Sequence, residues 1–226
     1  MTPPLLIEIL FFDGVDELAP FRVLRGAIGA GANFSVRLVT LTAVEEVTAS
    51  CGLCFRPDGV LDEPDILVVP DGGWVAQSDI GPWGEAHRGT IPTAIAHQAD
   101  GSAVVATVCT GTMLAAYGGL VTGRHAITHH AAIDDLRASG ANVVFARVVD
   151  DSDLISAERW VSHPASTSRF GWSNASQAPR LPPRSNPPSN TSAAASSGAG
   201  SSLPCSFESK RVQSLIPAGI GSYGSP

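Results

Sequence analysis

Basic residues are scarce in this chain of 226 residues: 14 Lys and Arg stand against 21 Asp and Glu, a net charge of −7. A nucleic-acid-binding protein needs a basic face, so this balance argues against a nucleic-acid partner. No apolar run reaches the roughly 18 residues of a spanning helix, and the basic residues are too scattered for a membrane-binding patch. The first residues lack a basic segment and a cleavage site, so the sequence predicts no signal peptide, no membrane contact and a cytoplasmic protein.

Cysteine is scarce as well, and the four cysteines, Cys51, Cys54, Cys109 and Cys205, do not form a disulfide framework. Cys51 and Cys54 have the spacing of a redox motif but lie between short strand-like segments, which favours a structural role. No second Cys or His pair at zinc-ligand spacing accompanies them. Neither a GxGxxG nor a GxxxxGK[ST] pattern occurs. We therefore expect no metal and no cofactor.

Apolar residues make up 44% of the chain, enough for one substantial core. Between residues 5 and 157, short β-branched runs alternate with helical patterns, which predicts a mainly parallel sheet with helices on both faces. The predicted strands cover 5–12, 34–41, 65–70, 103–108 and a final pair, 143–149 with 153–156, that turns around Asp150 and Asp151, with a hairpin over 47–55. The predicted helices cover 16–30, 92–99, 112–120 and 130–139.

The most informative stretch is the β-branched segment 103–108, which leads directly into Cys109, Thr110 and Gly111 and then into an apolar helix. A side chain on such a sharp strand-to-helix turn lies at a helix N-terminus, where free N–H groups and the helix dipole favour negative charge. Because thiolate is the reactive form of cysteine, the pattern predicts a nucleophilic Cys109. The same geometry carries the nucleophilic serine of many hydrolases. The alternative is that Cys109 is a small buried hydrophobic residue.

Five short motifs occur along the chain in a fixed order, at residues 12–18, 57–61, 68–73, 107–111 and 126–130. With these motifs the chain resembles the ThiJ/PfpI superfamily, whose sheet is flavodoxin-like and similar to that of class I glutamine amidotransferase domains. Within the superfamily, the run Cys109, Thr110, Gly111 is similar to the isonitrile hydratase branch and to the sensor domains of AraC-type regulators. An AraC-type regulator would also need a C-terminal helix-turn-helix, and none is visible.

The resemblance implies roles for the residues that match its motifs. Cys109 would be the nucleophile or an acid/base thiol, and Thr110 would orient substrate or water. The N–H groups of Gly73 and Thr110, beside Gly72, would form an oxyanion-type pocket. His129 would favour the thiolate or shuttle protons, the alternative being a surface helix-cap histidine. The remaining histidines that we expect to face solvent are His87, His97, His125 and His130.

The implied activity is hydration of a small-molecule isonitrile to an N-substituted formamide, by a homodimer that pairs through the sheet edge and adjoining helices. This chemistry needs a proton donor or nucleophile at carbon and an acid that activates water, which a thiol beside a carboxyl group supplies. In the family that carboxylate follows the first strand. Here Glu17 and Leu18 run directly into Ala19 and Pro20, so the acid and two neighbours are absent. Unless Glu17 or Asp16 replaces it, we expect a non-catalytic binding or sensor-like domain.

The composition changes abruptly at residue 158. Ser, Pro, Asn, Ala and Gly dominate 158–226 without a periodic apolar face, which is typical of a disordered tail. The resemblance implies instead a glycine-rich turn and a helix after residue 157, and plausible GC-rich codons for this segment encode such a helix when read two bases on. We therefore expect a C-terminally incomplete α/β domain over 1–157 and a tail that is disordered or out of frame. A frameshifted product would expose the sheet face that the helix covers and would be inactive.

Overall fold

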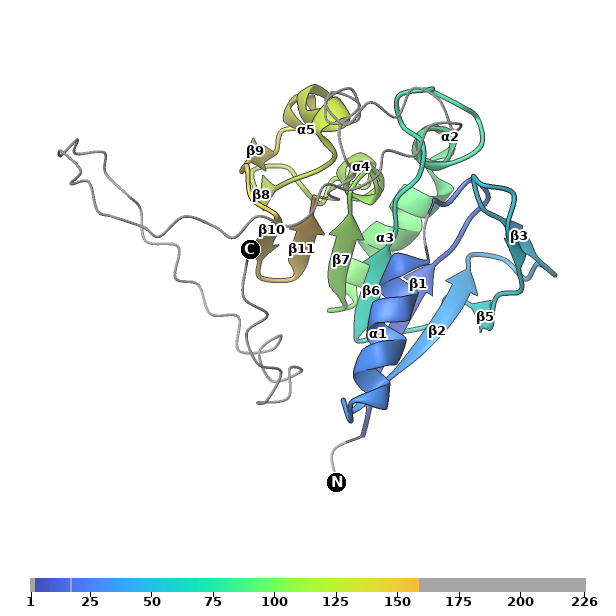
Figure 1. Cartoon of the computed structure of the whole chain (residues 1–226). Helices are drawn as coiled ribbons and strands as arrows, with labels where there is room; N and C mark the ends of the chain where they lie inside the picture. The colour runs from blue at the N-terminus through green and yellow to red at the C-terminus, as the bar shows by residue number, and fades with distance from the viewer. Residues whose placement is uncertain (1–2, 17, 159–226) are drawn as a thin grey trace, which may run out of the picture. The chain divides into compact units, whose positions relative to one another are not determined.

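The computed structural model describes residues 3–16 and 18–158, in which seven strands form one sheet in the order β10-β11-β7-β6-β1-β2-β5 (Figure 1). The strands are β1 (Leu5–Leu10), β2 (Phe34–Thr40), β5 (Gly59–Val60), β6 (Ile66–Val69), β7 (Val104–Val108), β10 (Val148–Asp151) and β11 (Leu154–Ala157). All neighbours pair in parallel except β10 with β11. The α/β, flavodoxin-like architecture predicted from the sequence is confirmed.

Two short strand pairs lie outside this sheet. β3 (Val47–Thr48) and β4 (Cys54–Phe55) form the expected antiparallel hairpin, and β8 (His125–Ala126) pairs in parallel with β9 (Asn142–Val143). The prediction of one strand over 143–149 is therefore wrong. β9 pairs with β8 outside the main sheet, and β10 begins only at Val148. The turn also lies at Ser152 and Asp153 rather than at Asp150 and Asp151. Ser152 closes it with a φ of +68°, a conformation that side chains other than glycine rarely adopt.

The helices are α1 (Ala19–Gly29), α2 (Pro82–Arg88), α3 (Thr90–Asp100), α4 (Gly111–Tyr117) and α5 (Ile133–Ala138), which follows the 3₁₀ turn η1 (His130–Ala132). α1 begins three residues later than predicted because Pro20 fits the first turn, where its missing N–H costs no hydrogen bond. α2 was not predicted. Its Pro82 also fits a first turn, and its Gly84 is required because a Cβ would collide with the backbone of Asp79.

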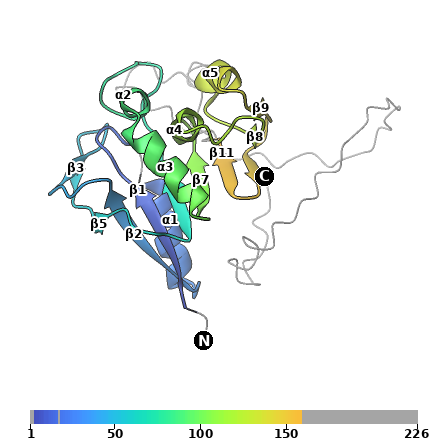
Figure 2. The ribbon, with the colours of Figure 1, turned by 180° about the vertical axis from the view of Figure 1, so that it is seen from behind.

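The helices divide between the two faces of the sheet. α1 lies over one face, and α3 and α4 lie over the other, as the front and back views show, with α2 packed against α3 and α4 (Figures 1 and 2). The Thr107 hydroxyl lies 2.8 Å from the Thr112 hydroxyl of α4, so the Thr107 side chain points toward α4. Because side chains alternate along a strand, every second residue of β7, and the residues paired with these on the neighbouring strands, lie on the same face. We call this the α4 face and the opposite one the α1 face.

The α4 face is closed. In β6, β7 and β11 the residues that point toward it are fully buried, among them Leu67, Val69, Val105 and Leu154, each 0% exposed. On the α1 face, neighbouring positions of β7 and β11 are only half-buried, namely Ala106, Val108, Ile155 and Ala157. Val148 of β10, which pairs with Ala157, is 57% exposed. Among the described residues α1 is the only helix that covers this face.

Of the expected tail, 158–226, only Glu158 is among the described residues. The disordered and out-of-frame readings of 159–226 therefore both remain predictions, as does any role of Cys205. Glu17 also lies outside the described residues.

Candidate active site

Cys109 lies on the sharp turn between β7, which ends at Val108, and α4, which begins at Gly111. Its φ is +54°, in the left-handed region that a residue with a Cβ rarely adopts. Its N–H donates to the Ala157 carbonyl at 2.7 Å, and its carbonyl accepts from the Thr128 hydroxyl at 2.9 Å. The elbow predicted at Cys109 is thus present, buried to 4% exposure and fixed from two sides.

Gly111, the glycine of the Cys-Thr-Gly run, is required because two backbone segments approach each other closely here. A Cβ on Gly111 would lie 2.6 Å from the Pro70 carbonyl oxygen and would also collide with the Val69 carbonyl oxygen. Because backbone atoms cannot move aside cheaply, only glycine lets α4 begin against the end of β6. This contact sets the position of the elbow relative to the loop that follows β6.

Thr110 ties the elbow to that loop. Its hydroxyl donates to the Gly72 carbonyl at 2.7 Å and accepts from the Gly72 N–H at 3.1 Å. Gly72 in turn forms a bridge with Val15, in the segment after β1. The observed contacts of the Thr110 side chain therefore position the loop, and they use its single donor within the protein.

Two backbone donors belong to this junction: Thr110 follows Cys109 in the chain, and Gly73 follows Gly72, to which Thr110 is hydrogen-bonded. The N–H groups of Gly73 and Thr110 have no hydrogen-bond acceptor in the part of the chain that the structure describes. Gly73 is exposed and Thr110 is buried. Donors of this kind stabilise negative charge that develops on a bound molecule, which is the chemistry expected of an oxyanion-type pocket.

His129 caps η1. Its Nδ1 accepts a 3.3 Å hydrogen bond from the Ala131 N–H, and its ring centroid lies 3.9 Å from that of His130. The structure thus gives the helix-cap arrangement that the sequence left as an alternative. His129 follows Thr128, whose hydroxyl binds the Cys109 carbonyl, so the cap and the elbow are joined through the backbone. The four histidines expected to face solvent are exposed, as predicted: His87, His97, His125 and His130.

The acidic partner is the weakest part of the site. The first turn of α1 contains no acidic residue, and Glu17 lies outside the described residues. Asp16 is close to the site through its backbone, because its N–H donates to the Asp71 carbonyl at 2.9 Å. Its carboxylate, however, accepts a 2.6 Å hydrogen bond from the Ser50 hydroxyl.

Asp71 was not singled out from the sequence as a candidate. It lies between β6 and Gly72 and is 2% exposed, so a carboxyl group is buried in the loop that Thr110 holds. The signal in the sequence is a charged residue placed directly after a buried strand, where ligands of parallel sheets bind.

The chain offers no built metal centre in the described ranges, where no three His, Cys, Asp or Glu side chains gather as potential ligands. Cys51 and Cys54 are exposed free thiols on the β3–β4 hairpin, and the Cys54 sulfur lies 3.6 Å from the Thr48 hydroxyl. Within the same ranges, none of the helices has the length and apolar character that crossing a bilayer requires.

Parallel sheet, elbow and loop together define a class of protein that carries a thiol at the carboxyl ends of its strands. The chain belongs to the DJ-1/PfpI family, whose model matches residues 6–170. It is similar to isonitrile hydratase of Pseudomonas putida, with 33% identity over 156 residues, 66% of this chain and 63% of that protein. The chain therefore aligns with less than two thirds of the length of this relative.

Solved structures support the same fold. A ThiJ/PfpI family protein from Pseudomonas syringae matches with a TM-score of 0.60 at 21% identity, over 70% of this chain and 64% of that one. Drosophila melanogaster DJ-1beta matches with a TM-score of 0.58 at 20% identity, over 74% of this chain and 86% of that one. At these identities the likeness concerns the fold alone.

Proposed function

We propose that this chain is a thiol-dependent enzyme that hydrates an isonitrile to an N-substituted formamide, with Cys109 as its nucleophile. The observation that carries the proposal is the elbow: a cysteine at φ +54° between β7 and α4, followed by Thr110, whose hydroxyl binds Gly72 in the loop that continues into Gly73. The similarity to isonitrile hydratase of Pseudomonas putida supports the choice of substrate class.

The reaction can be written so that every atom balances. The Cys109 S–H adds to the terminal carbon of R–N≡C: the S–H bond breaks, S–C and C–H bonds form, and the product is the thioimidate R–N=CH–S–Cys109. Water then attacks this carbon, and the sulfur leaves and recovers its proton. The product tautomerises to R–NH–CHO. The elbow would supply the nucleophile, and the Gly73 and Thr110 N–H groups would stabilise charge as it develops.

A second candidate is a non-catalytic domain that binds a small molecule. The observation that favours it concerns the described residues between β1 and α1: no acidic residue lies in the first turn of α1, and the Asp16 carboxylate accepts a hydrogen bond from Ser50. Without an acid to activate water, the thiol pocket would bind ligands without turning them over. For either candidate we propose a cytoplasmic homodimer, and the mass from light scattering tests the dimer.

The experiment is an assay of purified protein with benzyl isonitrile, following the formamide by chromatography. If the chain is an enzyme, Cys109→Ser reduces the rate at least about a thousandfold, as removal of a nucleophile does. The matched control Cys51→Ser alters an exposed thiol outside the elbow and keeps the rate. Absence of turnover, with Cys109 still alkylated much faster than Cys51 and Cys54, would instead support the binding domain.

A further inference from the structure

One donor of the oxyanion-type pocket lies on an exposed glycine. A Cβ placed on Gly73 would meet no atom within 4 Å, and its N–H has no acceptor among the described residues. A backbone donor stabilises developing charge only when its direction is fixed before the reaction. The direction of the Gly73 N–H is therefore set by the residues on either side of it, Gly72 and Trp74.

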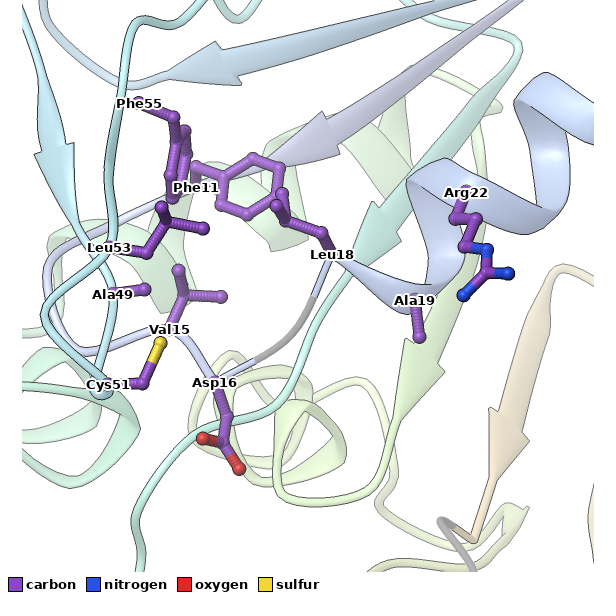
Figure 3. A pocket seen from close by; sticks show the side chains of 10 residues that line it. All are labelled: Phe11, Val15, Asp16, Leu18, Ala19, Arg22, Ala49, Cys51, Leu53 and Phe55. Carbon is purple, nitrogen blue, oxygen red and sulfur yellow. The ribbon is translucent and has the colours of Figure 1, made fainter.

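Gly72 is held from two directions. The Thr110 hydroxyl binds both its N–H and its carbonyl, and Val15 forms a bridge with it. Val15 is itself fixed, because its side chain is buried and points toward Leu53 (Figure 3), and its carbonyl accepts from the Ser50 N–H at 2.9 Å. The first neighbour of Gly73 is thus anchored to the elbow and to the segment after β1.

Trp74 is held by an aspartate of α5. The Trp74 indole N–H donates to Asp135 Oδ2 at 2.7 Å. The indole is buried, and it meets the Trp83 ring of α2 and the Tyr117 ring of α4 edge to face, with centroids 5.0 and 6.0 Å away. A buried indole N–H needs an acceptor, and its bond to a carboxylate is stronger than one to a neutral group. Asp135 therefore selects the orientation of the indole.

Asp135 lies on the same stretch of chain as a residue that holds the elbow. At the start of this stretch, 128–135, the Thr128 hydroxyl donates to the Cys109 carbonyl at 2.9 Å. At its end, Asp135 binds the residue that follows Gly73. One segment thus contacts both halves of the candidate site, the thiol-bearing turn and the loop after β6.

We propose that Asp135 and Trp74 are positioning residues, which direct the Gly73 N–H toward a molecule bound at Cys109. Neither side chain has to touch the substrate. The effect on rate rests on the proposed hydration reaction. The effect on the Gly73 amide does not, so the two proposals can fail separately.

Two substitutions remove the bond from its two ends. Trp74→Phe keeps an aromatic ring and deletes the N–H, and Asp135→Ala deletes the acceptor. We expect each to lower kcat for benzyl isonitrile about tenfold with KM unchanged, because a misdirected donor is lost in the transition state. In the Trp74→Phe background, Asp135→Ala should have no further effect. Asp135→Asn, whose amide oxygen still accepts a hydrogen bond, should restore most of the rate.

Asp134→Ala is the matched control. Asp134 and Asp135 both lie in the first turn of α5, so either change removes one negative charge from the start of the helix. The Asp134 carboxylate, however, pairs with Arg137 at 2.8 Å, whereas that of Asp135 binds Trp74. Asp134→Ala should therefore leave kcat unchanged.

The order parameter of the Gly73 amide, from ¹⁵N relaxation of the full chain, tests the positioning without turnover. We expect about 0.85 in the wild type and in Asp134→Ala, and below about 0.6 in Trp74→Phe and Asp135→Ala. If the wild type shows no turnover but these amide values are found, the hydration reaction is refuted and the positioning is supported.

Four results would overturn the positioning. They are a Gly73 amide that is already mobile in the wild type, one that stays ordered in Trp74→Phe and Asp135→Ala, an equal effect of Asp134→Ala, and a mobile Gly73 that leaves kcat unchanged in an active enzyme. A further tenfold loss in the double variant would show that the two side chains act separately, and would overturn it as well.

Discussion

The two faces of the sheet are made by the same strands, yet their helices bury very different amounts of surface. Six of the seven residues of α4 are buried, whereas none of the eleven residues of α1 is. In β6, β7 and β11 the side chains on the α4 face are buried, while on the α1 face Ala106, Val108, Ile155 and Ala157 of β7 and β11 are half-buried. The difference teaches that the strands next to the elbow are closed on the α4 face and partly open on the α1 face, and that the closed face also fixes the elbow, since α4 begins there.

The largest test of this comparison uses two neighbouring residues of β11 that point to opposite faces. Leu154→Ala removes a fully buried side chain and should lower the free energy of unfolding by about 3 kcal/mol. Ile155→Ala removes a half-buried one and should cost about 1 kcal/mol. Urea denaturation of both variants measures the difference, and equal losses would mean that the two faces are equally closed.

Replacing glycine by alanine should change the stability of the fold in opposite directions in α4 and in α1. Gly111→Ala in α4 forces a Cβ against the carbonyls of Val69 and Pro70, and should destabilise the fold by about 2 kcal/mol. Gly26→Ala in α1 meets no atom within 4 Å and should stabilise by about 1 kcal/mol through helix propensity. Thermal unfolding monitored by circular dichroism gives both shifts. A stabilised Gly111→Ala variant would refute the close approach at the elbow.

The smallest expected effect concerns the edge of the open face. Val148→Thr replaces a 57% exposed side chain on β10 and should change the free energy of unfolding by less than about 0.5 kcal/mol. It should nevertheless slow aggregation, since an apolar edge strand favours association between chains. Val149→Thr, on the closed face and 8% exposed, is the control and should cost about 2 kcal/mol because it buries a hydroxyl. Light scattering on heating follows aggregation; unchanged aggregation of Val148→Thr would show that this edge is already protected.

The fold was largely predictable because strand and helix periodicities differ clearly in this chain. The segments that became β6 and β7 are continuous runs of apolar or β-branched residues, as buried parallel strands are, whereas β1 contains Glu8 and β2 contains Ser35 and Arg37. The errors fall where the conformation depends on tertiary contacts. The turn at Ser152 needs a positive φ from a serine, and Gly84 of α2 is explained only by the nearby backbone of Asp79.

The candidate site was predictable only in part. The order strand, Cys109, Thr110, Gly111, helix indicated an elbow, because these residue types suit such a turn. The two hydrogen bonds between Thr110 and Gly72 were not predictable, since the residues lie 38 positions apart. The sequence also left two roles open for His129, and only the bond from the Ala131 N–H shows that it caps η1. The catalytic roles themselves remain predictions.

The backbone of Cys109 has a consequence for laboratory evolution of this protein. A φ of +54° costs a residue with a Cβ roughly 1–2 kcal/mol, whereas glycine adopts it freely. A library screened for thermal tolerance alone would therefore enrich glycine at position 109 and lose the thiol. Stabilised variants of this chain therefore have to be selected with an assay that also detects the Cys109 thiol.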